Sequence, residues 1–130
     1  MKYHLNEPPR EFTVGFGPPI AMKDCAQIDL APDEQVTFKT ESGAEYDVAR
    51  KSWGFYATPS VNGRLARFGL RTVLAKNRKD QFFILLVERG SETEFERYVH
   101  DEGLSVCGWL DDQNTLEKIA TAMNPAVCAM

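Results

Sequence analysis

Residues 68–88 read FGLRTVLAKNRKDQFFILLVE, and this stretch decides the fold. Over 68–76 apolar side chains recur at every second position, and the β-branched pair Thr72–Val73 favours a strand over a helix. Residues 77–80 form a polar turn. The run FFILLV at 82–87 shows no alternation, which is typical of a central strand covered on both faces. We therefore predict that 68–76 and 81–88 form the main hairpin of the protein.

Downstream of this hairpin the sequence predicts two helices separated by a strand. Ser91 and Glu94 form the pattern of a capping box, which indicates a helix over 91–102, and Gly103 is expected as its left-handed cap. A strand over 104–110 follows. A second helix is expected to begin near Asn114 and to end before Pro125.

Upstream the sequence indicates further short strands. Residues 35–39 and 45–48 alternate apolar and polar side chains, and Gly43 between them supplies a turn, so they predict a hairpin. Residues 11–16 and 53–57 are shorter strand candidates, and Asn62–Gly63 marks a tight turn.

The expected fold class is α+β, with a mostly antiparallel sheet and two C-terminal helices packed on one face. The strand-helix-strand run at 81–110 leaves one parallel pair open. The 130 residues suit a single domain, 1–130, with loose tails at 1–10 and 124–130. A homodimer fits an open sheet, because unpaired edges need a partner or a cover.

Composition limits the function classes. The net charge is −4, yet residues 50–79 hold eight basic and no acidic side chains, whereas the other residues hold 7 basic and 19 acidic ones. Three cysteines far apart in the chain predict neither a disulfide framework nor a zinc site, and reduced thiols fit a cytoplasmic location. The N-terminus has no apolar signal region, and no apolar run approaches the length that spans a membrane.

The basic stretch 50–79 is the candidate site. Arginine forks suit phosphate or carboxylate, aromatic rings offer flat faces to a sugar or base, and a turn can present backbone N–H groups to an anion. The alternative is that these basic side chains lie on a solvent-exposed face and that the acidic segments 91–102 and 111–117 balance their charge. The predicted ligand-binding residues are Trp53, Tyr56, Asn62, Arg64, Arg67 and Arg71.

No other motif points to chemistry. His100 falls in the last turn of the 91–102 helix, where a partly protonated imidazole meets the negative helix end. Cys107 is expected to be a buried, inert thiol. The Gly15–Phe16–Gly17 segment is interpreted as a turn instead of a phosphate loop. The sequence therefore predicts no metal, no cofactor and no catalytic constellation.

The segment WGFYATPSVNGRLARFGLR at 53–71 resembles a family of small bacterial proteins. These share a WGxYxTPSxNGRL-like segment, a following hydrophobic strand and a WLDD-like segment, here at 109–112. The resemblance spans about residues 11–112 and implies a setting beside genes for surface-polysaccharide and sugar-nucleotide synthesis. That setting favours a phosphorylated or nucleotide-linked sugar as the ligand. The resemblance implies no assigned activity, so it names no catalytic residue.

Three functions follow as hypotheses. The leading one is a non-enzymatic binding or accessory module that contacts an anionic small molecule or an acidic protein through 50–79. The alternative is an enzyme acting on a phosphorylated or nucleotide-linked sugar, with Tyr56, His100 or a carboxylate moving protons. Single-stranded nucleic-acid binding is the third, and the acidic remainder of the chain disfavours it.

Overall fold

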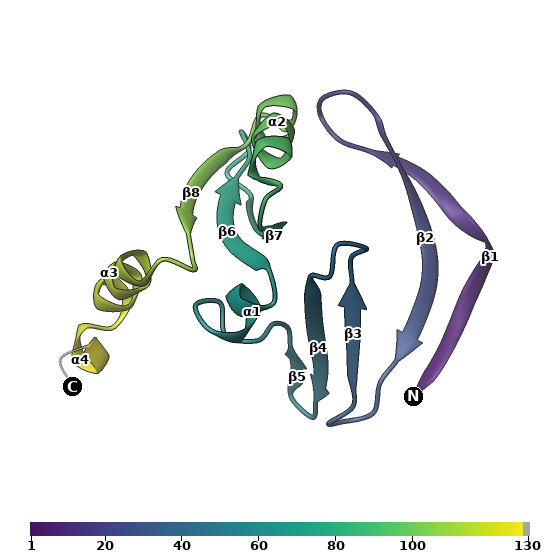
Figure 1. Cartoon of the computed structure of the whole chain (residues 1–130), viewed down its shortest axis with the longest axis horizontal. Helices are drawn as coiled ribbons and strands as arrows, with labels where there is room; N and C mark the ends of the chain where they lie inside the picture. The colour runs from purple at the N-terminus through teal and green to yellow at the C-terminus, as the bar shows by residue number, and fades with distance from the viewer. Residues whose placement is uncertain (129–130) are drawn as a thin grey trace.

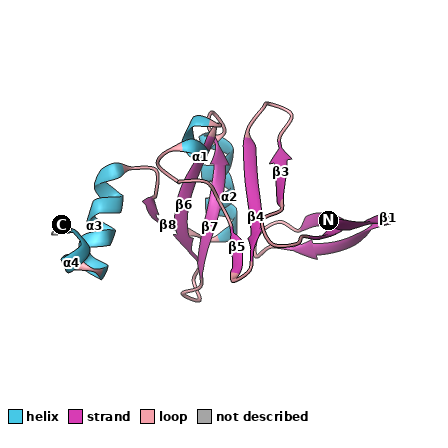
Figure 2. Ribbon diagram, turned by 90° about the horizontal axis from the view of Figure 1, so that it is seen from below, coloured by secondary structure: helices cyan, strands magenta, loops and turns pink. Residues whose placement is uncertain are grey.

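The computed structural model describes residues 1–128 and confirms the α+β class, with antiparallel strands divided among three small sheets (Figures 1 and 2). The first sheet pairs β1 (Lys2–Val14) with β2 (Ile20–Asp29). The second runs β3 (Gln35–Lys39), β4 (Glu45–Lys51) and β5 (Gly54–Tyr56). In the third, β6 (Leu70–Lys76) lies between β7 (Phe82–Glu88) and β8 (Ser105–Trp109). The helices are α1 (Arg64–Arg67), α2 (Glu92–Glu102), α3 (Gln113–Met123) and the short α4 (Pro125–Cys128).

The third sheet contains the predicted main hairpin, with Thr72 of β6 opposite Leu86 of β7. Both β7 and β8 run antiparallel to β6, so the described strands include no parallel pair. The prediction that FFILLV is a central strand is wrong, because β6 takes that position and β7 is an edge. Phe82 and Ile84 accordingly keep 60% and 55% of their surface exposed.

The hydrophobic core lies where α1, β6 and the turn before β4 meet. In this cluster Leu65 of α1 is fully buried, and Ala44 and Leu70 are nearly so. Val73 is also fully buried, but on the other face of β6. Short helix α1 continues from the tight turn at 60–63, and burial of Leu65 fixes it against β6. The core thus holds the first half of the basic stretch in a defined conformation.

The N-terminal arm, defined as β1, β2 and the loop between them (residues 2–29), is longer than the short strand predicted at 11–16. The predicted tail at 1–10 is wrong, because Lys2–Val14 form one strand paired with β2. Pro8 and Pro9 fall at a register irregularity between Leu5 and Arg10, where the missing proline N–H groups cost no ladder hydrogen bond. The arm stands beside the two other sheets as a separate hairpin (Figure 1).

The C-terminal elements follow the predicted order with different details. Ser91 precedes α2 without a side-chain cap bond, so the expected capping box is absent, whereas Gly103 has the predicted left-handed conformation at φ 65°. Helix α2 lies over the third sheet, but α3 extends away from it (Figures 1 and 2), which corrects the packing expected for the second helix. Residues 125–128 form α4 where a tail was predicted, and 129–130 lie outside the described residues. Within 1–128, the helices are too short or too polar to cross a bilayer.

Candidate ligand site

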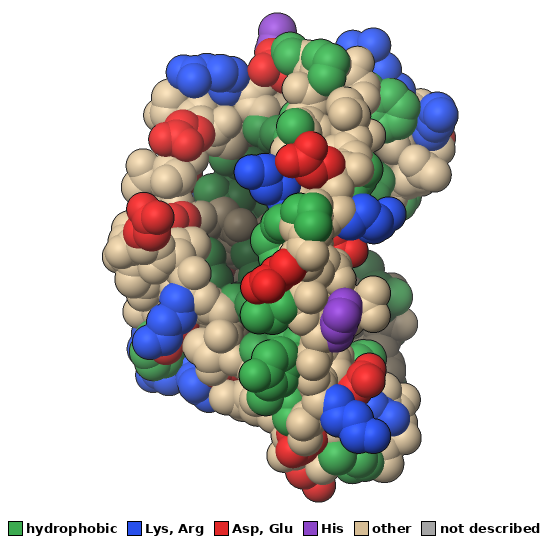
Figure 3. All heavy atoms as spheres, turned by 90° about the vertical axis from the view of Figure 1, so that its right-hand side faces the viewer, with side chains coloured by type: hydrophobic (Ala, Val, Ile, Leu, Met, Phe, Trp, Pro, Cys, Tyr) green, Lys and Arg blue, Asp and Glu red, His purple; other side chains and the backbone are tan. Residues whose placement is uncertain are grey.

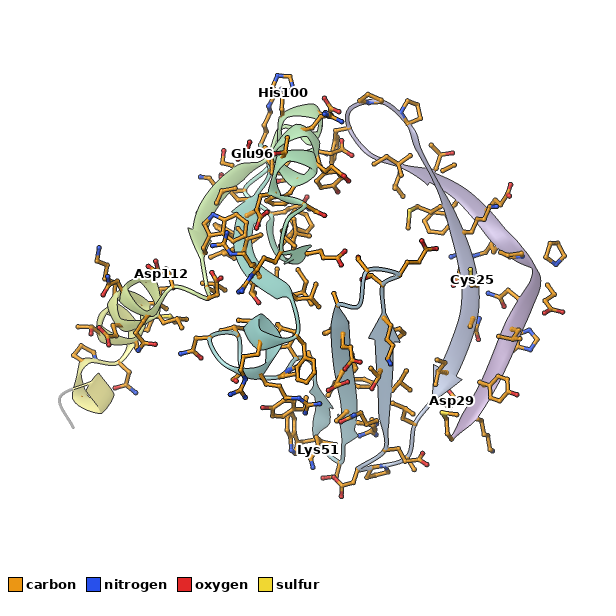
Figure 4. All side chains as sticks on the ribbon, in the orientation of Figure 1. Cys25, Asp29, Lys51, Glu96, His100 and Asp112 are labelled. Atoms are coloured by element: carbon orange, nitrogen blue, oxygen red, sulfur yellow. The ribbon has the colours of Figure 1, made fainter. Side chains whose placement is uncertain are left out.

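The basic stretch does not form one surface, because its side chains are divided among separate internal partners. Lys51 at the end of β4, labelled in Figure 4, pairs with Asp33 in the turn before β3. Lys76 pairs with Asp80 in the turn between β6 and β7. The acids at 33 and 80 lie outside the segments 91–102 and 111–117 that the alternative expected to balance the stretch.

Arg71 is held within the fold. Its Nε lies 2.9 Å from Oδ2 of Asp111 and its Nη2 lies 3.4 Å from Oδ1, a two-bond fork. Its guanidinium carbon also lies 4.1 Å from the Trp109 ring centre, and Nη1 is 3.9 Å from Glu92. The hydrogen bonds to Asp111 raise the pKa of Arg71 further. We leave Arg71 out of the proposed site, since its guanidinium joins β6 to Asp111 just after β8 and to Glu92 of α2.

Three other predicted residues lie apart from one another. Trp53 is at the turn between β4 and β5 and is 72% exposed. Asn62 donates a hydrogen bond to Gln113 at the start of α3. Arg67 is exposed at the end of α1 and has no ion pair to any residue of the described chain.

Two predicted residues do come together, in a pocket of about 290 Å³ between the second sheet and the turn before α1. Arg64 and Tyr56 contribute to it. The complete lining is Gln35, Asp47, Ala49, Tyr56, Pro59, Ser60 and Arg64. The volume is just below the roughly 300–1,000 Å³ typical of small-ligand pockets, so it suits a small ligand or one part of a larger one.

Local structure places the pocket's charged pair. Nη2 of Arg64 lies 2.6 Å from Oδ2 of Asp47, whose other oxygen accepts a hydrogen bond from the Thr37 hydroxyl at 2.7 Å. The Ser60 hydroxyl oxygen accepts from the Arg64 backbone N–H at 3.0 Å and so fixes the first turn of α1. Asp47 is buried, whereas half of the Arg64 side chain is exposed.

This arrangement offers complementary groups to a ligand. The guanidinium has N–H groups beyond the one directed at Asp47, and the carboxylate has acceptor capacity left beside it. The Ser60 hydroxyl oxygen accepts a hydrogen bond from Arg64, so the hydroxyl hydrogen is available to donate to a ligand. Tyr56, 52% exposed, presents an aromatic surface at the pocket. The site is therefore a mixed polar pocket, because Asp47 offsets the charge of Arg64.

Sequence reasoning missed Gln35, Asp47 and Ser60. The predicted hairpin carried a usable signal for Asp47, since its register places Asp47 opposite Thr37 on the face away from Tyr46 and Val48. Nothing local showed that the chain at 59–64 returns across that face.

The remaining candidates lie elsewhere. A pocket of about 340 Å³ includes Arg78, Lys79 and Phe16 and lies where the tip of the N-terminal arm meets the end of α2. His100 projects outward at that helix end (Figure 4) and is absent from the lining of the Arg64 pocket. Cys107 is exposed on edge strand β8, so the prediction of a buried thiol is wrong. Over residues 1–128 no three His, Cys, Asp or Glu side chains form a metal-binding group.

Comparisons with protein-family models, with curated proteins and with solved structures gave no match, so the interpretation of this site is based on its geometry.

Proposed function

We propose that this protein is a binding module for a small ligand that carries both an anionic group and hydroxyl groups. A phosphorylated or nucleotide-linked sugar has this chemistry. The observation that supports the proposal is the Arg64–Asp47 pair, at 2.6 Å, in a pocket that also contains the Tyr56 ring.

Each part of the ligand has a matching group. The free N–H groups of Arg64 donate to a phosphate oxygen, and a charge-assisted bond of this kind is stronger than a neutral one. Asp47 accepts from a sugar hydroxyl, which a purely cationic pocket could not do. Tyr56 covers an apolar face of the sugar ring. Binding a bare anion is less favourable here, because Asp47 repels it.

An enzyme acting on the same ligand is the alternative. Of the proton-transfer groups expected for it, Tyr56 lies at the pocket, and Asp47 supplies a carboxylate. His100 is 89% exposed at the end of α2 and takes no part in the pocket. Binding without turnover therefore needs fewer assumptions about the residues present.

The test is a titration followed through backbone amide resonances. The ligands are inorganic phosphate, a nucleoside diphosphate, a neutral hexose, a hexose 1-phosphate, nucleotide sugars and a short single-stranded RNA. We expect saturable shifts at Asp47, Tyr56, Ser60 and Arg64 with the phosphorylated sugars, and weaker ones with phosphate or hexose alone. Saturable shifts that avoid these residues, or none with any sugar ligand, would contradict the proposal. Phosphate release or sugar conversion in the same samples would favour the enzyme.

A further inference from the structure

The N-terminal arm has one apolar and one polar face. Its strand register places Tyr3 opposite Ile28, and Phe12 opposite Met22. Alternation along both strands then puts nearly all large apolar side chains on one side of the arm. That apolar face consists of Tyr3, Leu5, Phe12, Val14, Ile20, Met22, Ala26 and Ile28.

Most of this face has no cover in the single chain, although Val14 near the tip lines a pocket with side chains of β7 and α2. Phe12 and Met22 are 38% and 42% exposed, and Tyr3 is 67% exposed. Figure 3, which views the molecule from the side of the arm, shows hydrophobic side chains along it and in the hollow beside it. A two-stranded hairpin is marginally stable in water by itself, so an apolar face of this size needs a partner surface.

The arm is attached to the rest of the chain chiefly at its ends. At its tip the backbone N–H groups of Phe16 and Gly17 each donate to Glu102 at 2.7 Å. At its base the N-terminal ammonium pairs with Glu34. Its middle therefore presents the apolar face without contact to the other sheets.

The body of the molecule has uncovered apolar surfaces of its own. Phe82 and Ile84 lie on the face of β7 opposite the one that carries Phe83 and Leu85, which line a pocket with Tyr98 of α2. Phe82 and Ile84 are 60% and 55% exposed, and both lie on an edge strand. Apolar side chains of α3 are also exposed at the far end of the chain, at Ile119 and Met123.

The total accessible area of the chain exceeds that of a typical folded monomer of the same mass. The chain exposes 9545 Å². A folded monomer of its mass, 14.7 kDa, is expected to expose roughly 6,900 Å². If each of two copies buried the excess of about 2,600 Å², the interface would total roughly 5,000 Å², which is within the range of obligate homodimers.

We propose that a second copy of this chain covers these surfaces, in a symmetric dimer in which the apolar face of each N-terminal arm packs on the uncovered face of the partner's third sheet. The charged side chains Arg10 and Asp24 on the apolar face bind each other, so this pair brings no net charge to the contact. The area matches a homodimer, and the two-sided apolar pattern of 82–87 then has a physical reason. This proposal does not depend on the ligand pocket.

The test compares two lysine substitutions on adjacent positions of β2. Met22→Lys places a charge on the apolar face, and Ala21→Lys places the same charge on the opposite, polar face. Both positions are exposed in the single chain, so neither change disrupts its fold. Ile84→Lys makes the corresponding change on the body.

Sedimentation equilibrium and light scattering give the result. We expect the wild type and Ala21→Lys to be dimers, twice 14.7 kDa, at micromolar concentration. We expect Met22→Lys and Ile84→Lys to raise the dimer dissociation constant by at least about 100-fold, because each would bury a charge in the interface. A wild type that remains monomeric at about 100 μM overturns the proposal. A dimer that tolerates Met22→Lys, or that Ala21→Lys also dissociates, overturns the assigned face.

Discussion

Replacing Arg71 by methionine tests whether this arginine is part of the fold or free to bind a ligand. Methionine keeps the length of the side chain while it removes the fork to Asp111 and the contact over Trp109. Asp111, whose side chain is 13% exposed, then remains as a carboxylate without its partner. The change therefore removes favourable contacts and leaves an uncompensated charge.

The expected loss in free energy of unfolding follows from the partial burial of the Arg71–Asp111 pair. Breaking a fully buried ion pair costs about 3–5 kcal/mol, and an exposed pair contributes about 0–1 kcal/mol. The Arg71 side chain is 29% exposed, which lies between these limits. The contact with Trp109 adds about 0.5–1 kcal/mol. We expect Arg71→Met to lower the free energy of unfolding by about 2–3 kcal/mol.

Urea unfolding followed by fluorescence and circular dichroism measures this loss. Arg67→Met is the matched control, because Arg67 is an exposed arginine of the same stretch without an ion pair among the described residues, and we expect a change below about 0.5 kcal/mol. Adding Asp111→Leu to Arg71→Met should recover part of the loss. If Arg71→Met costs no more than Arg67→Met, Arg71 is not a structural residue and returns to the list of ligand-binding candidates.

Three further predictions concern single positions. Thr72 is fully buried, and its hydroxyl has no hydrogen-bond partner among residues 1–128. Thr72→Val should therefore raise the free energy of unfolding, measured in urea, by about 1 kcal/mol. A lower free energy of unfolding would show that the hydroxyl has a partner. A Cβ at Gly17 would clash with the backbone carbonyl oxygen of Asp101. Gly17→Ala should therefore separate the tip of the N-terminal arm from α2, and amide hydrogens at the tip should exchange faster. Unchanged exchange would refute the contact. Asp112 caps the start of α3, and hydrogen bonds from Thr115 lower the pKa of its carboxyl group in the folded protein. The stability that this cap contributes is therefore fully present above the pKa that Asp112 has in the unfolded chain. It is lost as the pH falls through the lower pKa of the folded state. The Thr115 amide resonance should thus titrate below the ordinary Asp value of about 3.9, and a midpoint at or above it would contradict the cap.

Local sequence patterns predicted the elements whose shape is set by near neighbours. The hairpin of β3 and β4 follows from alternation and from Gly43, which has the expected positive φ of 97°. The end of α2 follows from Gly103. These features depend on backbone sterics and on side chains a few positions apart, so a single sequence contains the information.

The sequence misled where burial depends on distant parts of the chain. Residues 82–87 are apolar on both faces, yet β7 is an edge strand with one face uncovered in the single chain. The apolar pattern alone does not show whether any other part of the chain covers both faces of the strand. Pro8 and Pro9 suggested a tail because their effect on a strand depends on whether the pairing has an irregularity at that point.

The candidate site was predicted in part. Charge segregation directed attention to residues 50–79, and two of the residues predicted there, Tyr56 and Arg64, line the same pocket. The same segregation could not distinguish Arg64, which lines the pocket, from Arg71, which pairs with Asp111. That difference depends on a contact forty residues apart in the chain.

The most direct test of the proposed function is calorimetric titration of a nucleotide sugar into the wild type, Arg64→Met and Arg67→Met. The two variants lose the same charge from the same short helix, and only Arg64 lines the pocket. We expect Arg64→Met to weaken binding by at least about tenfold, the loss of one charge-assisted hydrogen bond of about 1.5–3 kcal/mol. Arg67→Met should leave the affinity within about twofold of the wild type, because screened surface charge contributes little. Equal weakening by both variants, or none by Arg64→Met, would contradict the assignment of this pocket.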